Sequence, residues 1–194
     1  MFSGIVELTC PILKIRHARE QRILSIRKPR GWKLTEGESI SVEGVCSTVQ
    51  KSDAGTFSVV YMPESLRRST LGELRLNDHV NLERSLTLSS LIGGHLVQGH
   101  VDATGEIRNI RSEGEAKIIE FSAPRRLSRY IVEKGSIAID GISLTVVSQR
   151  PGRFTVSFLA YTLCRTTMGR KRVGSRVNLE ADMVAKYIES LIRK

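Results

Sequence analysis

Short runs of alternating hydrophobic and polar residues recur along the chain and predict β-strands. Clear examples are residues 23–26, 39–42 and 56–61, which are rich in β-branched or aromatic side chains and are separated by Gly, Asp and Asn. No helical pattern of 10 to 15 residues lies between them, so the spacing favours a small antiparallel barrel over a parallel α/β sheet. Short helical turns are predicted at 63–67, at the repeat of that segment and at 124–130, because proline suits the first turn of a helix.

The C-terminal segment has a different pattern. From Asp182 onward the apolar residues recur at helical spacing, and Asp182 is a suitable N-cap. These residues are Met183, Val184, Tyr187, Ile188, Leu191 and Ile192. A helix of about 12 residues is marginally stable alone in water and needs a packing partner. The partner is either its own barrel or another subunit.

The chain contains an internal repeat. Residues 36–83 align without gaps on residues 133–180, with 18 identities in 48 positions. Upstream, Gly4 to Glu7 align on Gly99 to Asp102. The 194 residues therefore form two similar units of about 95 residues that begin near residues 1 and 96, followed by the unrepeated helix.

Composition changes this picture little. The chain has 30 Lys and Arg against 20 Asp and Glu, a net charge of +10, which raises the hypothesis of nucleic-acid binding. The basic residues are spread over clusters at 27–30, 67–68, 125–126 and 170–172, and aromatic residues make up only 5% of the chain, so a solvated basic surface is the better interpretation. The three cysteines are too few and too scattered for a disulfide framework, and the absence of a CxxC motif argues against a zinc knuckle. No apolar run is long enough for a membrane helix, and the N-terminus does not resemble a signal peptide, so we expect a cytoplasmic protein.

The repeat directs attention to polar residues at matching positions. Cys46 and Thr48 project to one face of a predicted strand, and Ser143 and Thr145 do the same in the second unit. Such a pair either binds the edge of a heterocycle or belongs to an ordinary half-buried strand face.

His100 occurs in only one unit, since its counterpart is Ile5. A histidine at such a position suits proton transfer, and a structural histidine is the alternative. A metal site formed with His95 is disfavoured because no third ligand follows at a suitable spacing. Dinucleotide, P-loop and nucleophile-elbow motifs do not occur, so the residues alone predict a duplicated β-barrel with two related small-molecule sites.

Several ordered blocks resemble the riboflavin synthase family of lumazine-binding proteins. They are residues 1–7, 44–46, 93–100, 139–146 and 177–180, so the similarity extends from the N-terminus to the C-terminal helix. The resemblance implies an all-β fold of two tandem, closed, six-stranded Greek-key barrels. It divides the chain into an N-terminal lumazine-binding barrel (1–95), a C-terminal lumazine-binding barrel (96–181) and a helix (182–194) that contributes to oligomer contacts.

The resemblance also implies the reaction and the partners. The family converts two molecules of 6,7-dimethyl-8-ribityllumazine to riboflavin and 5-amino-6-(D-ribitylamino)uracil, the last step of riboflavin biosynthesis, by passing a four-carbon unit from one to the other. Because donor and acceptor are the same compound, no cofactor and no metal are expected. The family forms a homotrimer whose productive site lies between the N-terminal barrel of one subunit and the C-terminal barrel of its neighbour. Association with lumazine synthase is also implied, whereas nucleic acid and membrane are not.

Individual roles follow by matching positions. His100 corresponds to the proton-transfer residue, and Cys46 and Ser143 are polar groups near the two rings. Thr48 and Thr145 would bind the ring edges, Phe2 would pack beside the site, and Ser39 and Asp182 would lie near the ribityl chains. The complete set of positions that match ligand contacts is Phe2, Gly4, Ile5, Val6, Ser39, Ser47, Thr48, Val60, Tyr61, Met62, Pro63, Glu64, Ser65, Gly99, Val101, Lys134, Leu144, Thr145, Ser157, Phe158, Leu159, Ala160, Tyr161, Thr162 and Asp182.

Some positions depart from the family pattern. Ser3 and Ser65 replace threonine, Glu43 stands where asparagine is common, Ser47 replaces leucine, and Ala160-Tyr161 replaces proline and a polar residue.

Two other function classes are alternatives to the enzyme. A non-catalytic lumazine- or flavin-binding antenna protein shares the duplicated barrels, but such relatives tend to lose polar residues that are present here, including His100 and Ser143. A nucleic-acid-binding barrel is disfavoured by the few aromatic residues and the scattered charge.

Overall fold

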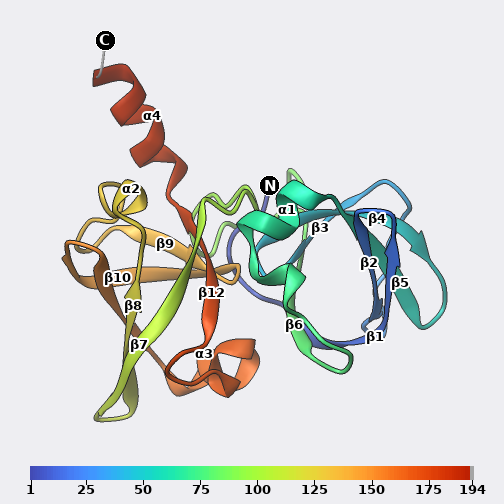
Figure 1. Cartoon of the computed structure of the whole chain (residues 1–194), viewed down its shortest axis with the longest axis horizontal. Coiled ribbons are helices and arrows are strands. Elements are labelled where there is room, and N and C mark those ends of the chain that lie inside the picture. Colours follow the sequence, from blue (N-terminus) through green and yellow to red (C-terminus); the bar gives the residue numbers. More distant parts are fainter. Residues whose placement is uncertain (193–194) are drawn as a thin grey trace.

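Each repeat of the sequence folds into one closed barrel of six antiparallel strands, as predicted (Figure 1). The computed structural model describes residues 1–192. Barrel 1 has the strand order β1-β2-β5-β4-β3-β6, and barrel 2 has the order β10-β11-β8-β7-β12-β9, which is the same cyclic order when β7 to β12 are matched to β1 to β6. The strands of barrel 1 are β1 (Leu8–Ala18), β2 (Gln21–Arg27), β3 (Ser39–Val42), β4 (Val45–Ser52), β5 (Thr56–Tyr61) and β6 (His79–Arg84). Those of barrel 2 are β7 (Ala103–Glu113), β8 (Ala116–Ser122), β9 (Ser136–Ile139), β10 (Ile142–Arg150), β11 (Arg153–Phe158) and β12 (Arg176–Ala181).

Short helices connect the strands at equivalent places in the two barrels. They are α1 (Pro63–Arg68) with η1 (Thr70–Gly72) in barrel 1, and α3 (Ala160–Arg165) with η2 (Thr167–Arg170) in barrel 2. The helical turn predicted at 124–130 is shorter and forms α2 (Arg125–Ser128). No helix in the described part of the chain is long and apolar enough to cross a membrane.

Alternating side chains fill each barrel. Strand β5 alternates buried and half-buried residues along its length, which places Phe57 and Val59 in the core of barrel 1. In barrel 2, Phe121 stacks on Phe154 with ring centroids 5.4 Å apart. This alternation explains why the period of two in the sequence predicted the strands correctly.

The two barrels meet at the tips of two equivalent hairpins. Strands β3 and β4 are joined by Glu43-Gly44, and β9 and β10 by Asp140-Gly141; all four residues have positive φ, as a two-residue type I′ turn requires. A Cβ on Gly44 would overlap the backbone nitrogen of Gly141, so the close approach of the tips requires glycine.

A buried polar cluster surrounds these tips. The side chain of Asn81 donates to the carbonyl oxygen of Asp140 at 2.9 Å, and that of Asn178 donates to the carbonyl oxygen of Glu43 at 2.8 Å. Lys171 Nζ lies 2.9 Å from Asp140 Oδ2 and 3.8 Å from Glu43 Oε2. We call Glu43, Asn81, Asp140, Lys171 and Asn178 the inter-barrel cluster.

The C-terminal segment forms the predicted helix α4 (Met183–Ile192), which projects from barrel 2 (Figure 1). Asp182 Oδ1 accepts a hydrogen bond from the Val184 nitrogen at 2.9 Å, which confirms the N-cap. The prediction extended the helix to residue 194, and residues 193 and 194 lie outside the described part. Polar contacts tie α4 to barrel 2: Lys186 pairs with Asp102 at 2.7 Å, and Glu189 accepts from Tyr130. The exposed apolar side chains of α4 are Val184, Tyr187, Ile188, Leu191 and Ile192.

Candidate functional site

The segment that precedes each barrel, with Gly4 before barrel 1 and Gly99 before barrel 2, lies against the other barrel. We call these two segments the crossing segments. The Ser143 nitrogen in β10 donates to the carbonyl oxygen of Gly4 at 2.7 Å, and the Cys46 nitrogen in β4 donates to that of Gly99 at 2.8 Å. Both glycines have positive φ, and a Cβ on Gly99 would come within 2.7 Å of the Cys46 Cβ. Each polar strand face identified in the sequence, Cys46 with Thr48 and Ser143 with Thr145, therefore adjoins residues from the other repeat.

Hydrophobic contacts also join each crossing segment to the opposite barrel. Val6 packs against the core of barrel 2, and Val101 packs against the core of barrel 1. Phe2 is fully buried between the barrels with Val97 and Ala138, and Cys46 packs against this small cluster. These contacts bring the predicted residues Gly4, Ile5 and Val6 to Ser143, and Gly99, His100 and Val101 to Cys46.

Two buried glutamates hold these crossing segments in place. Glu83 in β6 accepts hydrogen bonds from the Ser3 and Gly4 nitrogens at 2.6 and 3.1 Å. Its equivalent in β12, Glu180, accepts from the Gln98 and Gly99 nitrogens at 2.7 and 2.9 Å. Burial raises the pKa of both carboxyls above the usual range, although these hydrogen bonds act in the opposite direction.

The outer face of β4 presents the predicted residues of barrel 1. Cys46 is half-buried and Thr48 is exposed, while Val45, Ser47 and Val49 point into the barrel. The expectation that Cys46 and Thr48 share a face is thus confirmed. Ser39 lies opposite Thr48 on β3. The remaining members of this set vary in exposure: Met62 and Glu64 are exposed, and Val60, Pro63 and Ser65 are half-buried.

Two predicted ligand contacts in barrel 1 have side chains inside the barrel. Ser47 Oγ lies 2.8 Å from the Tyr61 hydroxyl and donates to the Val45 carbonyl oxygen at 2.9 Å. Burial raises the pKa of the Tyr61 hydroxyl. The structure therefore places the Ser47 and Tyr61 side chains in the core, away from the outer face that Cys46 and Thr48 share.

Barrel 2 presents an equivalent set. Ser143 is half-buried and Thr145 is exposed on β10, and Leu144 packs against the core of barrel 2. Phe158 is fully buried, so its side chain supports the strand from inside. Of the other predicted contacts, Lys134, Leu159, Ala160 and Tyr161 are exposed, and Ser157, Thr162 and Asp182 are half-buried.

One contact was not anticipated from the sequence. The Nδ1 atom of His95 lies 2.7 Å from Ser143 Oγ, and burial lowers the pKa of the His95 imidazole, against the opposing charge of Asp182. A Cβ on Gly94 would come within 2.6 Å of Ser143 Oγ, so glycine is needed for this approach. The Gly93-Gly94 pair before His95 is the sequence signal that could have indicated it. His100, the predicted proton-transfer residue, is exposed.

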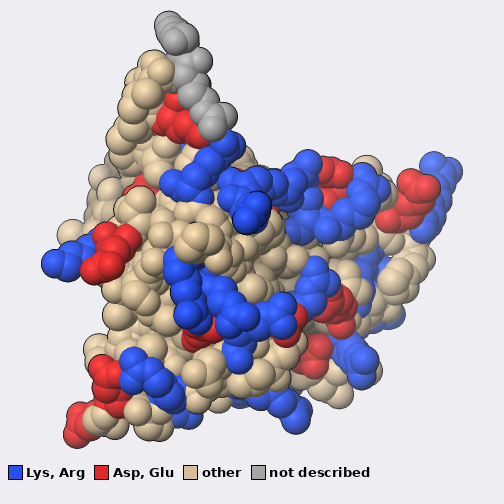
Figure 2. Space-filling model, turned by 60° about the vertical axis from the view of Figure 1, so that its left-hand side comes forward, with Lys and Arg blue, Asp and Glu red and all other residues tan. Residues whose placement is uncertain are grey.

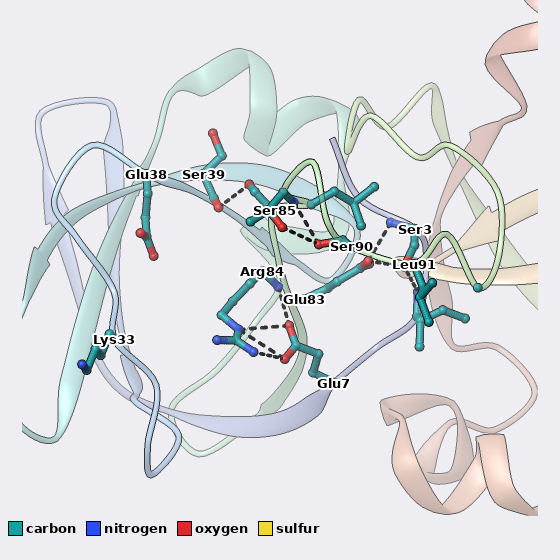
Figure 3. Close-up of a pocket in the computed structure, with 14 residues that line it drawn as sticks. Ser3, Glu7, Lys33, Glu38, Ser39, Glu83, Arg84, Ser85, Ser90 and Leu91 are labelled. Carbon is teal, nitrogen blue, oxygen red and sulfur yellow. Dashed lines mark hydrogen bonds and ion pairs between the residues drawn. The ribbon is translucent and has the colours of Figure 1, made fainter.

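A separate pocket of about 680 Å³ lies beside β6 in barrel 1 (Figure 3). Arg84 and Glu7 form an ion pair at 2.8 Å within it, and Ser85 Oγ donates to the Ser39 carbonyl oxygen at 2.7 Å. Among the predicted site residues only Ile5 and Ser39 line this pocket. Within residues 1–192, no group of three or more His, Cys, Asp and Glu side chains is arranged to hold a metal ion.

Comparison with known proteins identifies relatives over the whole length. The model of the lumazine-binding domain matches residues 3–85 and 98–182. The chain is 46% identical to riboflavin synthase of Mycobacterium tuberculosis over 198 residues, which cover 100% of this chain and 98% of that protein. It is 42% identical to riboflavin synthase of Actinobacillus pleuropneumoniae and 36% identical to that of Bacillus subtilis; each alignment covers 100% of this chain and 91% of the relative.

Solved structures with the same fold have lower sequence identity. The crystal structure of LumP complexed with riboflavin superposes with a TM-score of 0.87 at 23% identity, and covers 93% of this chain and 99% of LumP. LumP complexed with 6,7-dimethyl-8-(1'-D-ribityl) lumazine gives a TM-score of 0.84 at 22% identity, with the same coverage. These similarities establish the fold.

Proposed function

The chain belongs to the riboflavin synthase family, and we propose that it converts two molecules of 6,7-dimethyl-8-ribityllumazine to riboflavin and 5-amino-6-(D-ribitylamino)uracil. The enzyme passes a four-carbon unit from one lumazine to the other. The observation that carries this proposal is the pair of equivalent polar edges, Cys46 with Thr48 and Ser143 with Thr145, each completed by a segment of the other repeat.

Each barrel binds one lumazine. Residues 1–95 form the N-terminal lumazine-binding unit, and residues 96–181 form the C-terminal one. Gly4 and Gly99 let the crossing segments lie directly against Ser143 and Cys46, because the packing around both glycines excludes a side chain. Holding two rings in one orientation replaces an encounter in solution by an aligned reaction, which is the main contribution expected of the protein.

Proton transfer at the acidic methyl groups of the ring is assigned to His100. Its imidazole is exposed next to Gly99, where the crossing segment meets Cys46, and an imidazole can both donate and accept a proton. Cys46 and Ser143 contact the two rings. Ser143 is supported by the His95 contact at 2.7 Å.

The proposal includes a homotrimer in the cytoplasm. Five apolar side chains of α4 are exposed in the single chain, and burying them against other copies would remove this apolar surface from water. The reaction then takes place where the N-terminal barrel of one subunit faces the C-terminal barrel of the next. Association with lumazine synthase is proposed on the family resemblance alone.

The test is to incubate the purified protein with 6,7-dimethyl-8-ribityllumazine and follow riboflavin fluorescence. Riboflavin should form at half the amount of lumazine consumed. Lumazine binding without turnover would support the antenna protein instead, and absence of binding would refute both functions. His100→Ala should lower kcat by about 100-fold, the scale of general acid-base catalysis, with little change in lumazine affinity. An unchanged kcat would remove His100 from the chemistry.

A further inference from the structure

The two hairpin tips in the inter-barrel cluster have equivalent polar surroundings. Glu43 and Asp140 are counterparts in the sequence repeat, and so are Asn81 and Asn178. The Asn81 nitrogen donates to Glu43 Oε1 at 2.6 Å, and the Asn178 nitrogen donates to Asp140 Oδ1 at 2.7 Å. The fold therefore places one buried carboxyl group at each tip, where the two barrels meet.

A single ammonium group lies between these two carboxyls. Lys171 Nζ is 2.9 Å from Asp140 Oδ2 and 3.8 Å from Glu43 Oε2, and it donates to the carbonyl oxygen of Arg176 at 2.9 Å. The counterpart of Lys171 in the first repeat is Leu74, which packs against the core of barrel 1. Figure 2 shows many Lys and Arg side chains at the surface, where water solvates them, whereas the Lys171 side chain is only 17% exposed. Lys171 therefore supplies one positive charge for two buried acidic groups.

Ionisation of Glu43 leaves two negative charges against this one cation. Burial and the nearby Asp140 charge raise the pKa of Glu43 to about 8, so the carboxyl loses its proton just above neutral pH. Tyr61 of β5 also lies near Glu43, but burial raises the pKa of its hydroxyl, which stays neutral over this range. Glu73 is a further acidic group near Lys171, and it pairs with Arg176. The second negative charge is therefore uncompensated, in a place where water screens it weakly.

The resulting repulsion acts on hairpin tips that touch each other directly. A Cβ on Gly44 would lie 2.4 Å from the Gly141 nitrogen, so the backbones of the two tips are already in contact. Two residues further along the hairpins, the Cys46 and Ser143 nitrogens donate to carbonyl oxygens of the crossing segments. Separation of the tips therefore moves both polar strand faces relative to the crossing segments that adjoin them.

We propose that Glu43 is a positioning residue for both lumazine sites. With its proton, Glu43 leaves the hairpin tips in contact and the two sites aligned; without it, repulsion from Asp140 separates the tips and lowers turnover. The effect reaches the sites through Cys46 and Ser143, because Glu43 itself is buried in the inter-barrel cluster. The proposal rests on the proposed function, since it assumes that the polar strand faces bind the rings. Loss of alignment slows the reaction of two bound molecules more than it weakens the binding of each one.

The experiment compares kcat of Glu43→Gln with kcat of the wild type on 6,7-dimethyl-8-ribityllumazine from pH 6 to 9. The ratio of the two values should be near one at pH 7 and rise to about 10 at pH 9, because the protonated fraction of a group that titrates near pH 8 falls about tenfold over this range. Other titrating groups contribute equally to both curves. Lumazine affinity should be the same for both proteins at each pH. Glu36→Gln is the matched control, since that glutamate is exposed and its ratio should stay near one throughout.

A ratio that stays constant from pH 6 to 9 would overturn the proposal, and so would a pH effect confined to lumazine affinity. Hydrogen exchange gives a second measurement that does not depend on turnover. Between pH 7 and 9 the wild type should lose protection at the Cys46 and Ser143 amides relative to amides within β5 and β11, whereas Glu43→Gln should keep it. Equal protection in the two proteins would also overturn the proposal. A wild type that loses this protection but does not turn over lumazine at any pH contradicts the proposed function alone.

Discussion

Replacing Glu43 with glutamine tests how the contact between the two barrels is stabilised. Glu43 is buried in the inter-barrel cluster, where its Oε1 accepts hydrogen bonds from the Asn81 nitrogen at 2.6 Å and from Thr167 Oγ1 at 3.1 Å. Burial and, secondarily, the nearby Asp140 carboxylate raise the pKa of Glu43 to about 8, although Lys171 and the two hydrogen bonds lower it. Glu43 therefore holds a proton in the folded protein at neutral pH.

The effect on stability follows from proton linkage. In the unfolded chain the carboxyl has a pKa of 4.5 and is ionised at pH 7, so the folded state must take up a proton there. Each pH unit above 4.5 lowers the free energy of unfolding by about 1.4 kcal/mol until the folded group itself ionises near pH 8, which amounts to about 3 kcal/mol at pH 7. A folded pKa above the unfolded value gives stability that is present below pH 4.5 and lost as the pH rises toward 8.

Glutamine has no proton to take up, and its carbonyl oxygen retains the acceptor role toward Asn81. We therefore expect Glu43→Gln and the wild type to have similar free energies of unfolding near pH 4.5. At pH 7 the variant should be more stable by up to about 3 kcal/mol, since the wild type alone loses stability over this range.

The assay is urea unfolding followed by circular dichroism at pH 5, 6, 7 and 8. Glu36→Gln is a suitable control, because that glutamate is exposed and its replacement should change stability by less than about 0.5 kcal/mol. A difference between Glu43→Gln and the wild type that stays constant from pH 5 to 8 would refute the reasoning. A variant that is less stable at every pH would do the same.

Two further predictions concern the crossing segment and the C-terminal helix. Gly94→Ala should destabilise the protein by about 1–3 kcal/mol and lower lumazine turnover, because the added Cβ would lie 2.5 Å from the Ser143 Cβ. Gly55→Ala is the control, since a Cβ there meets no atom within 4 Å and should change neither stability nor turnover. Urea unfolding measures the stability of both variants, and the lumazine assay measures their turnover. Deletion of residues 183–194 should convert the proposed trimer to a monomer in light scattering while circular dichroism still reports folded barrels, and an unchanged mass would contradict the role of α4.

Much of the fold was predictable because its signals are local. The alternation in 56–61 and the Glu43-Gly44 and Asp140-Gly141 turns specify strands and tight hairpins through neighbouring residues. The repeat at an offset of 97 then required two units of one architecture. The shared face of Cys46 and Thr48 followed from strand periodicity alone, and it agrees with the half-buried Cys46 and exposed Thr48 between the buried Val45, Ser47 and Val49.

Other features of the site depend on contacts between residues far apart in the sequence. Ser47 and Tyr61 were predicted ligand contacts from the family resemblance, but Ser47 shares the inner face of β4 with Val45 and Val49. Closure of the barrel then buries the Ser47 and Tyr61 side chains against each other. The His95 contact with Ser143 likewise spans 48 residues and needs both barrels in place.

By itself, the sequence determined that the chain forms two equivalent barrels, since strand periodicity and turn residues are properties of short segments. Only the tertiary structure decided that each barrel is completed by the other repeat, with Gly4 at Ser143 and Gly99 at Cys46. The physical reason is that the apolar side chains of the crossing segments, Val6 and Val101, are half-buried and pack against the core of the opposite barrel, and this packing depends on how two complete barrels meet.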